Sequence, residues 1–133
     1  MSITAAIRDR LKAQSVAGGR VYRDERPEGT ALPAAVIYLV SSPAVSTLDG
    51  RRDYQRSRIQ IDCFAAGRGA ADDLADAVVA AVEATFEAAG VRVDRSFIAN
   101  RRGDSDRRKE VSGEPGGTTY RTMLDLSVWH SPI

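Results

Sequence analysis

The chain has 133 residues, of which 43% are hydrophobic and 28% charged, and its formal net charge at pH 7 is +1. This size and composition predict one globular domain covering residues 1–133, and the near-zero net charge excludes a general attraction to polyanions. A single cysteine excludes an internal disulfide, and we expect an intracellular protein with no membrane span, because no apolar run is long enough and the N-terminus lacks a signal-peptide pattern.

Residues 3–14 are expected to form the first helix. Their apolar positions recur every three or four residues, as in an amphipathic helix, and Ser2 is a suitable N-cap. The apolar stripe consists of Ile3, Ala6, Ile7 and Leu11. Residues 20–22 then form a short strand or an extended link, and residues 23–33 are expected to be a loop, because they contain prolines and a glycine among charges.

Two strands joined by a projecting hairpin are expected next. Residues 34–42 form a continuous run rich in β-branched residues after a proline, which predicts a strand that is central or covered on both faces. Residues 54–64 alternate between polar and apolar, which predicts a strand with one buried side. That side would hold Ile59, Ile61 and Cys63. Asp49-Gly50 is a strong turn signal, so the polar connection 43–53 is expected to be a long hairpin.

A long helix is expected to begin at residue 70, where the apolar residues take up a helical period. It is expected to end at Gly90, because a glycine suits a left-handed C-cap. Its apolar stripe consists of Ala71, Leu74, Val78, Ala81, Val82, Thr85 and Ala89, with Phe86 at the edge. The opposite side is acidic and carries Asp72, Asp76, Glu83 and Glu87. This distribution predicts that one side of the helix packs on a sheet while the other is exposed.

The rest of the chain is expected to supply two more strands, because residues 91–97 and 118–129 alternate between polar and apolar. The outward side of the last strand carries Trp129, a residue type that often marks an interface. Residues 100–117 contain a basic run followed by glycines and a proline, and are expected to be a long loop, either functional or disordered.

These elements predict an α+β fold with the order α-β-β-α-β-β. The strand pairs 34–42 with 54–64 and 91–98 with 118–129 should each be antiparallel and join into one largely antiparallel, four-stranded sheet. Two helices packed on one face complete a two-layer architecture, with long loops projecting from it. The predicted core consists of Leu74, Val78, Val82, Ile59, Ile61, Leu124, Leu126, Ile7 and Leu11.

The sequence contains no constellation typical of an enzyme or a cofactor site. No histidines or cysteines have metal-ligand spacing, no glycine-rich phosphate loop follows a strand, and the acidic residues between 72 and 76 are better explained as a solvated helix side. Ser127, His130 and Asp125 are the residue types of a hydrolase triad, but they share one strand without the turn that exposes a nucleophile. We therefore expect no catalytic, cofactor-binding or metal-binding residues.

Three groups of residues are candidates for contact with a partner. The basic segment 101–109 is either a solvated loop or a contact for nucleic acid or an acidic protein surface. Its basic residues are Arg101, Arg102, Arg107, Arg108 and Lys109. The other two groups are the acidic helix side and the tip of the projecting hairpin, and Trp129 on the outward face of the sheet is a separate candidate. The tip consists of Leu48, Asp49, Gly50, Arg51 and Arg52.

Several segments occur in a characteristic order along nearly the whole chain. They are Gly19-Arg20-Val21-Tyr22, Leu32-Pro33-Ala34-Ala35-Val36-Ile37, Leu48-Asp49-Gly50, Arg58-Ile59-Gln60-Ile61-Asp62-Cys63, the alanine-rich helix, Tyr120-Arg121 and Leu124-Asp125-Leu126-Ser127-Val128-Trp129-His130. In this order they resemble the tail completion proteins (tail terminator or head-to-tail joining proteins) of long-tailed bacteriophages, prophages and gene transfer particles. The basic segment 101–109 is the part least similar to that family.

The resemblance implies a non-enzymatic virion protein at the tail–head junction, assembled in the host bacterial cytoplasm. Such proteins form a homo-hexameric ring at the head-proximal end of the tail tube and stop its growth. One face of the ring binds the tail tube protein, and the other binds the head-completion (stopper) protein of the neck. DNA passes through the lumen without sequence-specific binding. The resemblance implies no cofactor and no contact with a membrane.

The residues leave one main alternative open, a small nucleic-acid-binding module that uses the basic segment 101–109. Salt-dependent DNA binding by the isolated protein would favour it. For a ring, we expect the basic segment of one subunit to lie against the acidic helix side of the next, because that side has no obvious partner of opposite sign within its own helix. Each exposed pair contributes about 0–1 kcal/mol, so several must act together.

Overall fold

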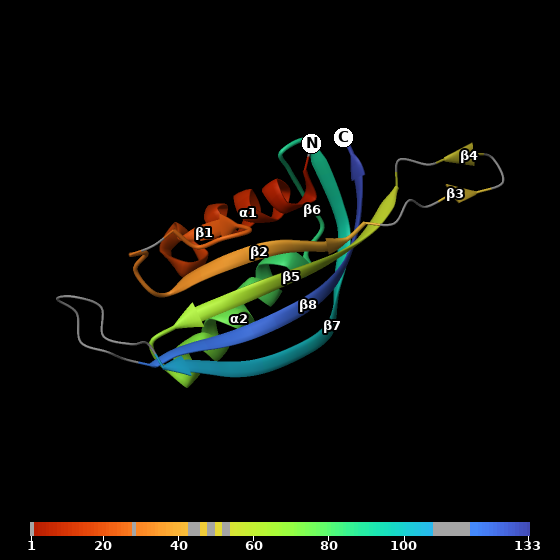
Figure 1. Cartoon of the computed structure of the whole chain (residues 1–133). Coiled ribbons are helices and arrows are strands. Elements are labelled where there is room, and N and C mark those ends of the chain that lie inside the picture. The colour runs from red at the N-terminus through yellow and green to blue at the C-terminus, as the bar shows by residue number, and fades with distance from the viewer. Residues whose placement is uncertain (1, 28, 43–45, 48–49, 52–53, 108–117) are drawn as a thin grey trace.

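The computed structural model describes residues 2–27, 29–42, 46–47, 50–51, 54–107 and 118–133, and one strongly curved sheet forms its centre (Figure 1). The six strands of this sheet are β1 (Val21–Arg23), β2 (Ala34–Ser41), β5 (Gln55–Ala65), β6 (Phe86–Ala88), β7 (Val91–Arg107) and β8 (Thr118–Pro132). They lie in the order β1-β2-β5-β8-β7-β6. The short strands β3 (Ser46–Thr47) and β4 (Gly50–Arg51) pair with each other and stand away from the sheet.

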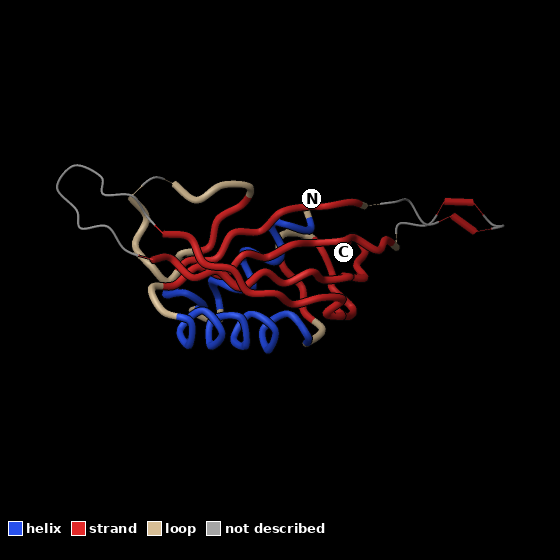
Figure 2. Tube along the Cα trace, turned by 60° about the horizontal axis from the view of Figure 1, so that its bottom comes forward, coloured by secondary structure: helices blue, strands red, loops and turns tan. Residues whose placement is uncertain are grey.

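Two α-helices and the inner face of the sheet enclose one hydrophobic core. Helix α1 (Ile3–Ala13) begins after Ser2, whose Oγ accepts a 3.3 Å hydrogen bond from the Ala5 amide, so the expected N-cap is confirmed. One turn of 3-10 helix, η1 (Val16–Gly19), follows α1. Helix α2 (Arg68–Glu83) runs along one side of the strands (Figure 2). All nine residues of the predicted core are buried in this cluster.

The expected four-stranded, largely antiparallel sheet with the order α-β-β-α-β-β is wrong, because the sheet has six strands and is mixed. Strand β1 pairs with β2 in parallel, and β6 is an additional edge strand antiparallel to β7. Both additions are three residues long, which is too short for a periodic pattern in the sequence. The two expected antiparallel pairings, β2 with β5 and β7 with β8, are present.

Helix α2 ends earlier than expected, and Gly90 does not cap it. Ala84 has an extended backbone (φ −75°, ψ 153°) and terminates the helix after Glu83. Phe86 is then buried as part of β6, and Gly90, at φ 76°, lies in the turn between β6 and β7. Phe86 would point inward both on the apolar stripe of a helix and on a short strand, so periodicity cannot distinguish the two structures. Tertiary packing determines that this segment is a strand. Two other residues expected on the buried stripe are exposed, Thr85 and Ala89.

Strand β7 continues far into the segment that was expected to be a loop. Residues 100–107 stay in antiparallel register with β8 as far as the pair of Arg107 and Thr118. The charged residues of this stretch suit a strand at the side of a sheet, where side chains reach solvent. The expectation of a loop is therefore wrong for 100–107, and its remaining part, 108–117, lies outside the described residues.

Strand β2 is covered over only part of its length. The stretch from Ala34 to Ile37 is buried, whereas Leu39 and Val40 are 49% and 57% exposed. Strand β1 ends at Arg23, opposite Ile37, so no strand among the described residues pairs with the rest of β2 on that side. Strand β2 is central, between β1 and β5, as one of the two expected alternatives had it, whereas cover on both faces is wrong for its second half.

Candidate interaction surface

Two arginines join the acidic side of α2 to the β7–β8 hairpin. Arg101 Nη1 lies 2.8 Å from Asp76 Oδ1, and this hydrogen bond raises the pKa of Arg101. Arg68, in the first turn of α2, donates to Thr122 Oγ1 at 2.6 Å and lies 3.8 Å from Asp72 Oδ1. Asp72 and Asp76 therefore have partners in their own chain, and Asp72 has one in its own helix, so the premise of the expected contact between subunits does not hold for these two residues.

Gly103 makes room for this arrangement. A Cβ atom at this position would lie 2.6 Å from Arg68 Nη1. The guanidinium group of Arg68 also donates to the Arg121 carbonyl at 3.1 Å. Because Gly103 has no side chain, Arg68 of α2 can reach β8 and hold the far end of the β7–β8 hairpin against the helix.

A buried carboxylate lies on the outward face of the sheet, away from the helices. Asp62 on β5 is 2% exposed, accepts a 2.8 Å hydrogen bond from Gln60 Nε2 and lies 3.6 Å from Arg121 Nη1. Burial raises the pKa of Asp62. Arg121 on β8 also donates to Asp104 on β7 at 2.6 Å, and this bond lowers the pKa of that carboxyl. Arg121 therefore connects three neighbouring strands.

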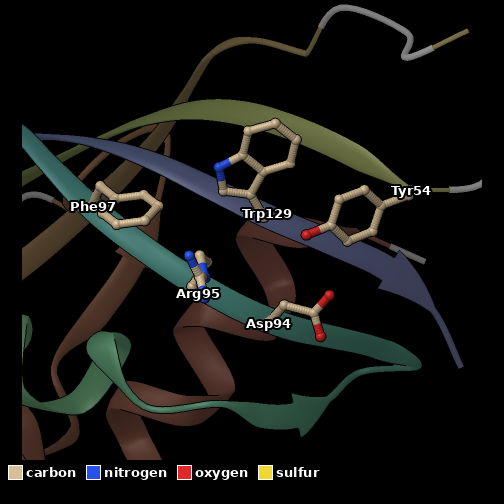
Figure 3. A pocket seen from close by; sticks show the side chains of 5 residues that line it. All are labelled: Tyr54, Asp94, Arg95, Phe97 and Trp129. Carbon is tan, nitrogen blue, oxygen red and sulfur yellow. The ribbon is translucent and has the colours of Figure 1, made fainter.

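Trp129 belongs to a cluster of aromatic and arginine side chains elsewhere on the outward face (Figure 3). The rings of Tyr54 and Trp129 are stacked, with centroids 5.5 Å apart and 23° between the planes. The guanidinium of Arg56 lies 5.6 Å from the Trp129 centroid, and that of Arg95 lies 5.5 Å from the Phe97 centroid. Trp, Tyr and Arg are the residue types that dominate binding energy at protein interfaces. The cluster borders an open hollow of about 490 Å³, lined by Tyr54, Asp94, Arg95, Phe97 and Trp129.

Comparison with known protein families identifies the family of this chain. The family model described as "Tail completion protein gp17" matches residues 2–131. The chain belongs to this family. The resemblance expected from the ordered segments is thereby confirmed, and the protein is a structural protein of phage-type tails.

Solved structures show a similar fold. A chain of the structure titled "Virion of native gene transfer agent (GTA) particle" has a TM-score of 0.64 and 18% sequence identity, covering 98% of this chain and 95% of that one. A second solved structure has a TM-score of 0.52 and 18% identity, covering 95% and 92% of the two chains. No curated protein sequence matches the chain.

The other candidate residues of the tail completion protein lie on several surfaces. Glu83 ends α2, whereas Glu87, expected on the same helix side, lies on β6, and both are exposed. Arg102 is exposed on β7, and Arg107 is its last residue. Strand β4 consists of Gly50 and Arg51. The candidates outside the described residues are Leu48, Asp49, Arg52, Arg108 and Lys109. Trp129 lies on the outward face of the sheet, as expected, and α2 packs on the other face.

A serine–histidine contact occurs inside the domain, but not the one that the sequence suggested. His130 Nε2 lies 2.7 Å from Ser57 Oγ, and Ser57 Oγ lies 2.8 Å from Ser42 Oγ. Burial lowers the pKa of His130. Ser57 is fully buried, so its hydroxyl cannot meet a substrate in this conformation. Ser127 points to the opposite side of β8, which separates it from His130.

A cluster of metal ligands and a membrane-spanning helix are both absent from the described part of the chain. No group of three His, Cys, Asp or Glu side chains in it could hold a metal ion. None of its helices is long and apolar enough to cross a membrane.

Sequence reasoning found Trp129 but missed the side chains around it. Arg56 and Arg95 lie directly opposite Trp129 on the two neighbouring strands. Tyr54 and Phe97 complete the cluster from the same two sides. The available signal was the alternation of these strands, with arginines and aromatics at outward positions. The register that brings those positions together depends on tertiary pairing.

Proposed function

We propose that this tail completion protein forms a hexameric ring at the head-proximal end of the tail tube. There it stops tube growth and joins the tail to the head-completion protein of the neck. The observation that carries the proposal is the family match over residues 2–131. The fold shared with a chain of a gene transfer agent virion, over 98% of this chain, supports a place in a phage-like particle.

The arrangement of surfaces supports such a role. The aromatic–arginine cluster lies on the outward face of the sheet, the acidic side of α2 lies on the other, and β3 and β4 extend beyond the body (Figure 1). A ring subunit needs two different surfaces for its two neighbours, and further surfaces for the tube and the neck. DNA would pass through the lumen without sequence-specific contacts.

A nucleic-acid-binding module has weaker support. Arg101, the first basic residue of the segment 101–109, already pairs with Asp76 and lies 3.8 Å from Asp72. Paired arginines have less charge to offer a phosphate backbone. Salt-dependent binding to duplex DNA, combined with no binding to tail tubes, would replace our proposal by this alternative.

Growth of tail tubes in vitro tests the proposal. Tubes would be assembled from the purified tube protein of the same particle, and the tail completion protein would be added while they lengthen. We expect growth to stop and a ring to be visible at one tube end by electron microscopy, whereas heat-unfolded protein should have no effect. Tubes that keep lengthening at the same rate in the presence of folded protein would refute the proposal.

A further inference from the structure

The large exposed apolar side chains of the sheet lie on two strand edges that are not fully paired. Strand β1 pairs with residues 35–37 of β2 only, and Leu39 and Val40 beyond that stretch are 49% and 57% exposed. Strand β6 pairs with residues 91–93 of β7 only, and Phe97 and Ile98 beyond it are 49% and 38% exposed. Edges of this kind are templates for pairing with another chain.

These two edges lie at the same level of the sheet. Leu39 on β2 is opposite Ile59, Ile59 is opposite Leu126, and Leu126 is opposite Ile98 on β7. Leu39 and Ile98 therefore end one row of side chains that runs across all four long strands. A second copy placed beside the first at the same height would bring the Leu39 end of one row against the Ile98 end of the other.

The strand directions allow this placement without turning either copy over. Strands β2, β5, β8 and β7 are each antiparallel to the next, so β2 and β7 run in opposite directions. When two copies have the same orientation, β7 of one is antiparallel to β2 of the other. A contact between two different edges is heterologous, and it closes into a ring when the rotation between copies permits.

Charge favours joining unlike edges over joining like edges. The Asp24 amide donates to the Ile37 carbonyl at 3.0 Å, so exposed Asp24 and Glu25 lie just beyond β2. The row through Val36 ends on the other side of the sheet at exposed Arg102, and the row through Ile37 ends there at Arg101, which is already paired with Asp76.

Two β2 edges would bring carboxylates together, and two β7 edges would bring guanidinium groups together. Arg23 and Arg26 keep their charge beside these carboxylates, with Arg23 3.4 Å from Ser2 Oγ and Arg26 4.7 Å from the Phe64 ring centroid, so the preference for unlike edges is small.

We propose that the β2 edge (Asp24, Glu25, Leu39 and Val40) of one subunit binds the β7 edge (Phe97, Ile98 and Arg102) of a second copy. The proposal rests on the proposed ring and names the surfaces that close it. β-Bulges directly after Leu39 and after Ile98 interrupt the regular register. The contact therefore consists of apolar side chains flanked by the charged groups, rather than of a long hydrogen-bonded ladder.

Two variants that each remove one edge provide the test. Val40→Asp removes the β2 edge and Phe97→Asp the β7 edge, and both residues are about half exposed, so the melting temperatures should match that of the wild type. By sedimentation velocity over a concentration series, the wild type is expected to form closed oligomers. Each variant alone should associate more than about tenfold more weakly. Ala80→Asp, on the exposed side of α2, is the matched control and should associate like the wild type.

An equimolar mixture of Val40→Asp and Phe97→Asp gives the decisive result. The first variant keeps its β7 edge and the second keeps its β2 edge, so one intact contact can form between them. The two edges left over both carry the new carboxylate, so we expect a 1:1 pair that grows no further. A mixture that stays monomeric, or either variant alone reaching the wild-type oligomer, would overturn the edge assignment. If Phe97→Asp associates normally and instead loses binding to a labelled DNA duplex, the β7 edge is a nucleic-acid surface and the assignment is also wrong.

The same variants separate this inference from the proposed function. If the wild type and both variants all cap tail tubes, the tube-capping function is retained and the edge contact is refuted. If the mixture forms the 1:1 pair but the wild type never caps tubes, the edge contact is supported and the proposed function falls.

Discussion

Leu124→Ala tests the packing that supports every surface described above. Leu124 is fully buried in β8, opposite Ile61 on one side and Arg101 on the other, and belongs to the shared core. Truncating such a leucine removes its transfer free energy and leaves a cavity, at a cost of about 2–5 kcal/mol. For a chain of 133 residues each kcal/mol corresponds to roughly 3–4 °C, so the melting temperature should fall by about 6–20 °C.

Thermal and urea unfolding followed by circular dichroism measure this loss. The matched control is Met123→Ala, because Met123 precedes Leu124 in β8, points to the opposite face and is only partly buried. We expect the control to cost less than about 1 kcal/mol. The reasoning would be refuted if Leu124→Ala also cost less than about 1 kcal/mol, or no more than the control.

Three further predictions concern the contact of Arg68 with the β7–β8 hairpin, the pH dependence of stability, and the tip of the hairpin that projects between β2 and β5. Gly103→Ala should displace only the far end of the flexible Arg68 side chain, so we expect the free energy of unfolding in urea to fall by no more than about 1 kcal/mol. Adding Gly103→Ala to Arg68→Ala should cost nothing further, and full additivity would contradict the contact between Arg68 and the hairpin. Because burial holds the His130 pKa below its usual 6.5, the folded state binds this proton less readily than the unfolded state, so stability should be retained above about pH 6.5 and fall below it. His130→Gln should flatten that part of the pH profile of unfolding, and an unchanged slope would mean that other groups cause it. Deleting residues 48–52 should leave the melting temperature unchanged but abolish attachment of tails to heads, whereas a normal yield of joined particles would show that the tip is dispensable.

Periodic elements with one clearly buried side could be predicted from the sequence. Strands β5 and β8 alternate over most of their length, and the apolar stripe of α1 follows a recognisable N-cap at Ser2. Such patterns specify which residues enter the core, because burial of one side is what stabilises the element. For this reason the nine predicted core residues were correct even though the strand count was not.

The errors in the predicted strands arise where an element is short, or where its side chains are exposed and exposure does not restrict the residue type. Strands β1 and β6 have three residues each, so their identity depends on the neighbours that they pair with. The extension of β7 beyond residue 100 is rich in charge because its outer edge is open, and that composition resembles a loop. The partners of Trp129 were missed for a related reason, since Arg56 and Arg95 meet it only through the register of three strands.

Electron microscopy of particles assembled with and without this protein tests the central claim most directly. Tail length and the join between head and tail would be measured in host cells that produce the particle, with the gene for this protein deleted or restored. Our account predicts tubes of variable, excessive length and no joined heads in its absence, and tubes of uniform length ending in a ring when it is restored. Tails of normal length joined to heads in its absence would contradict the account.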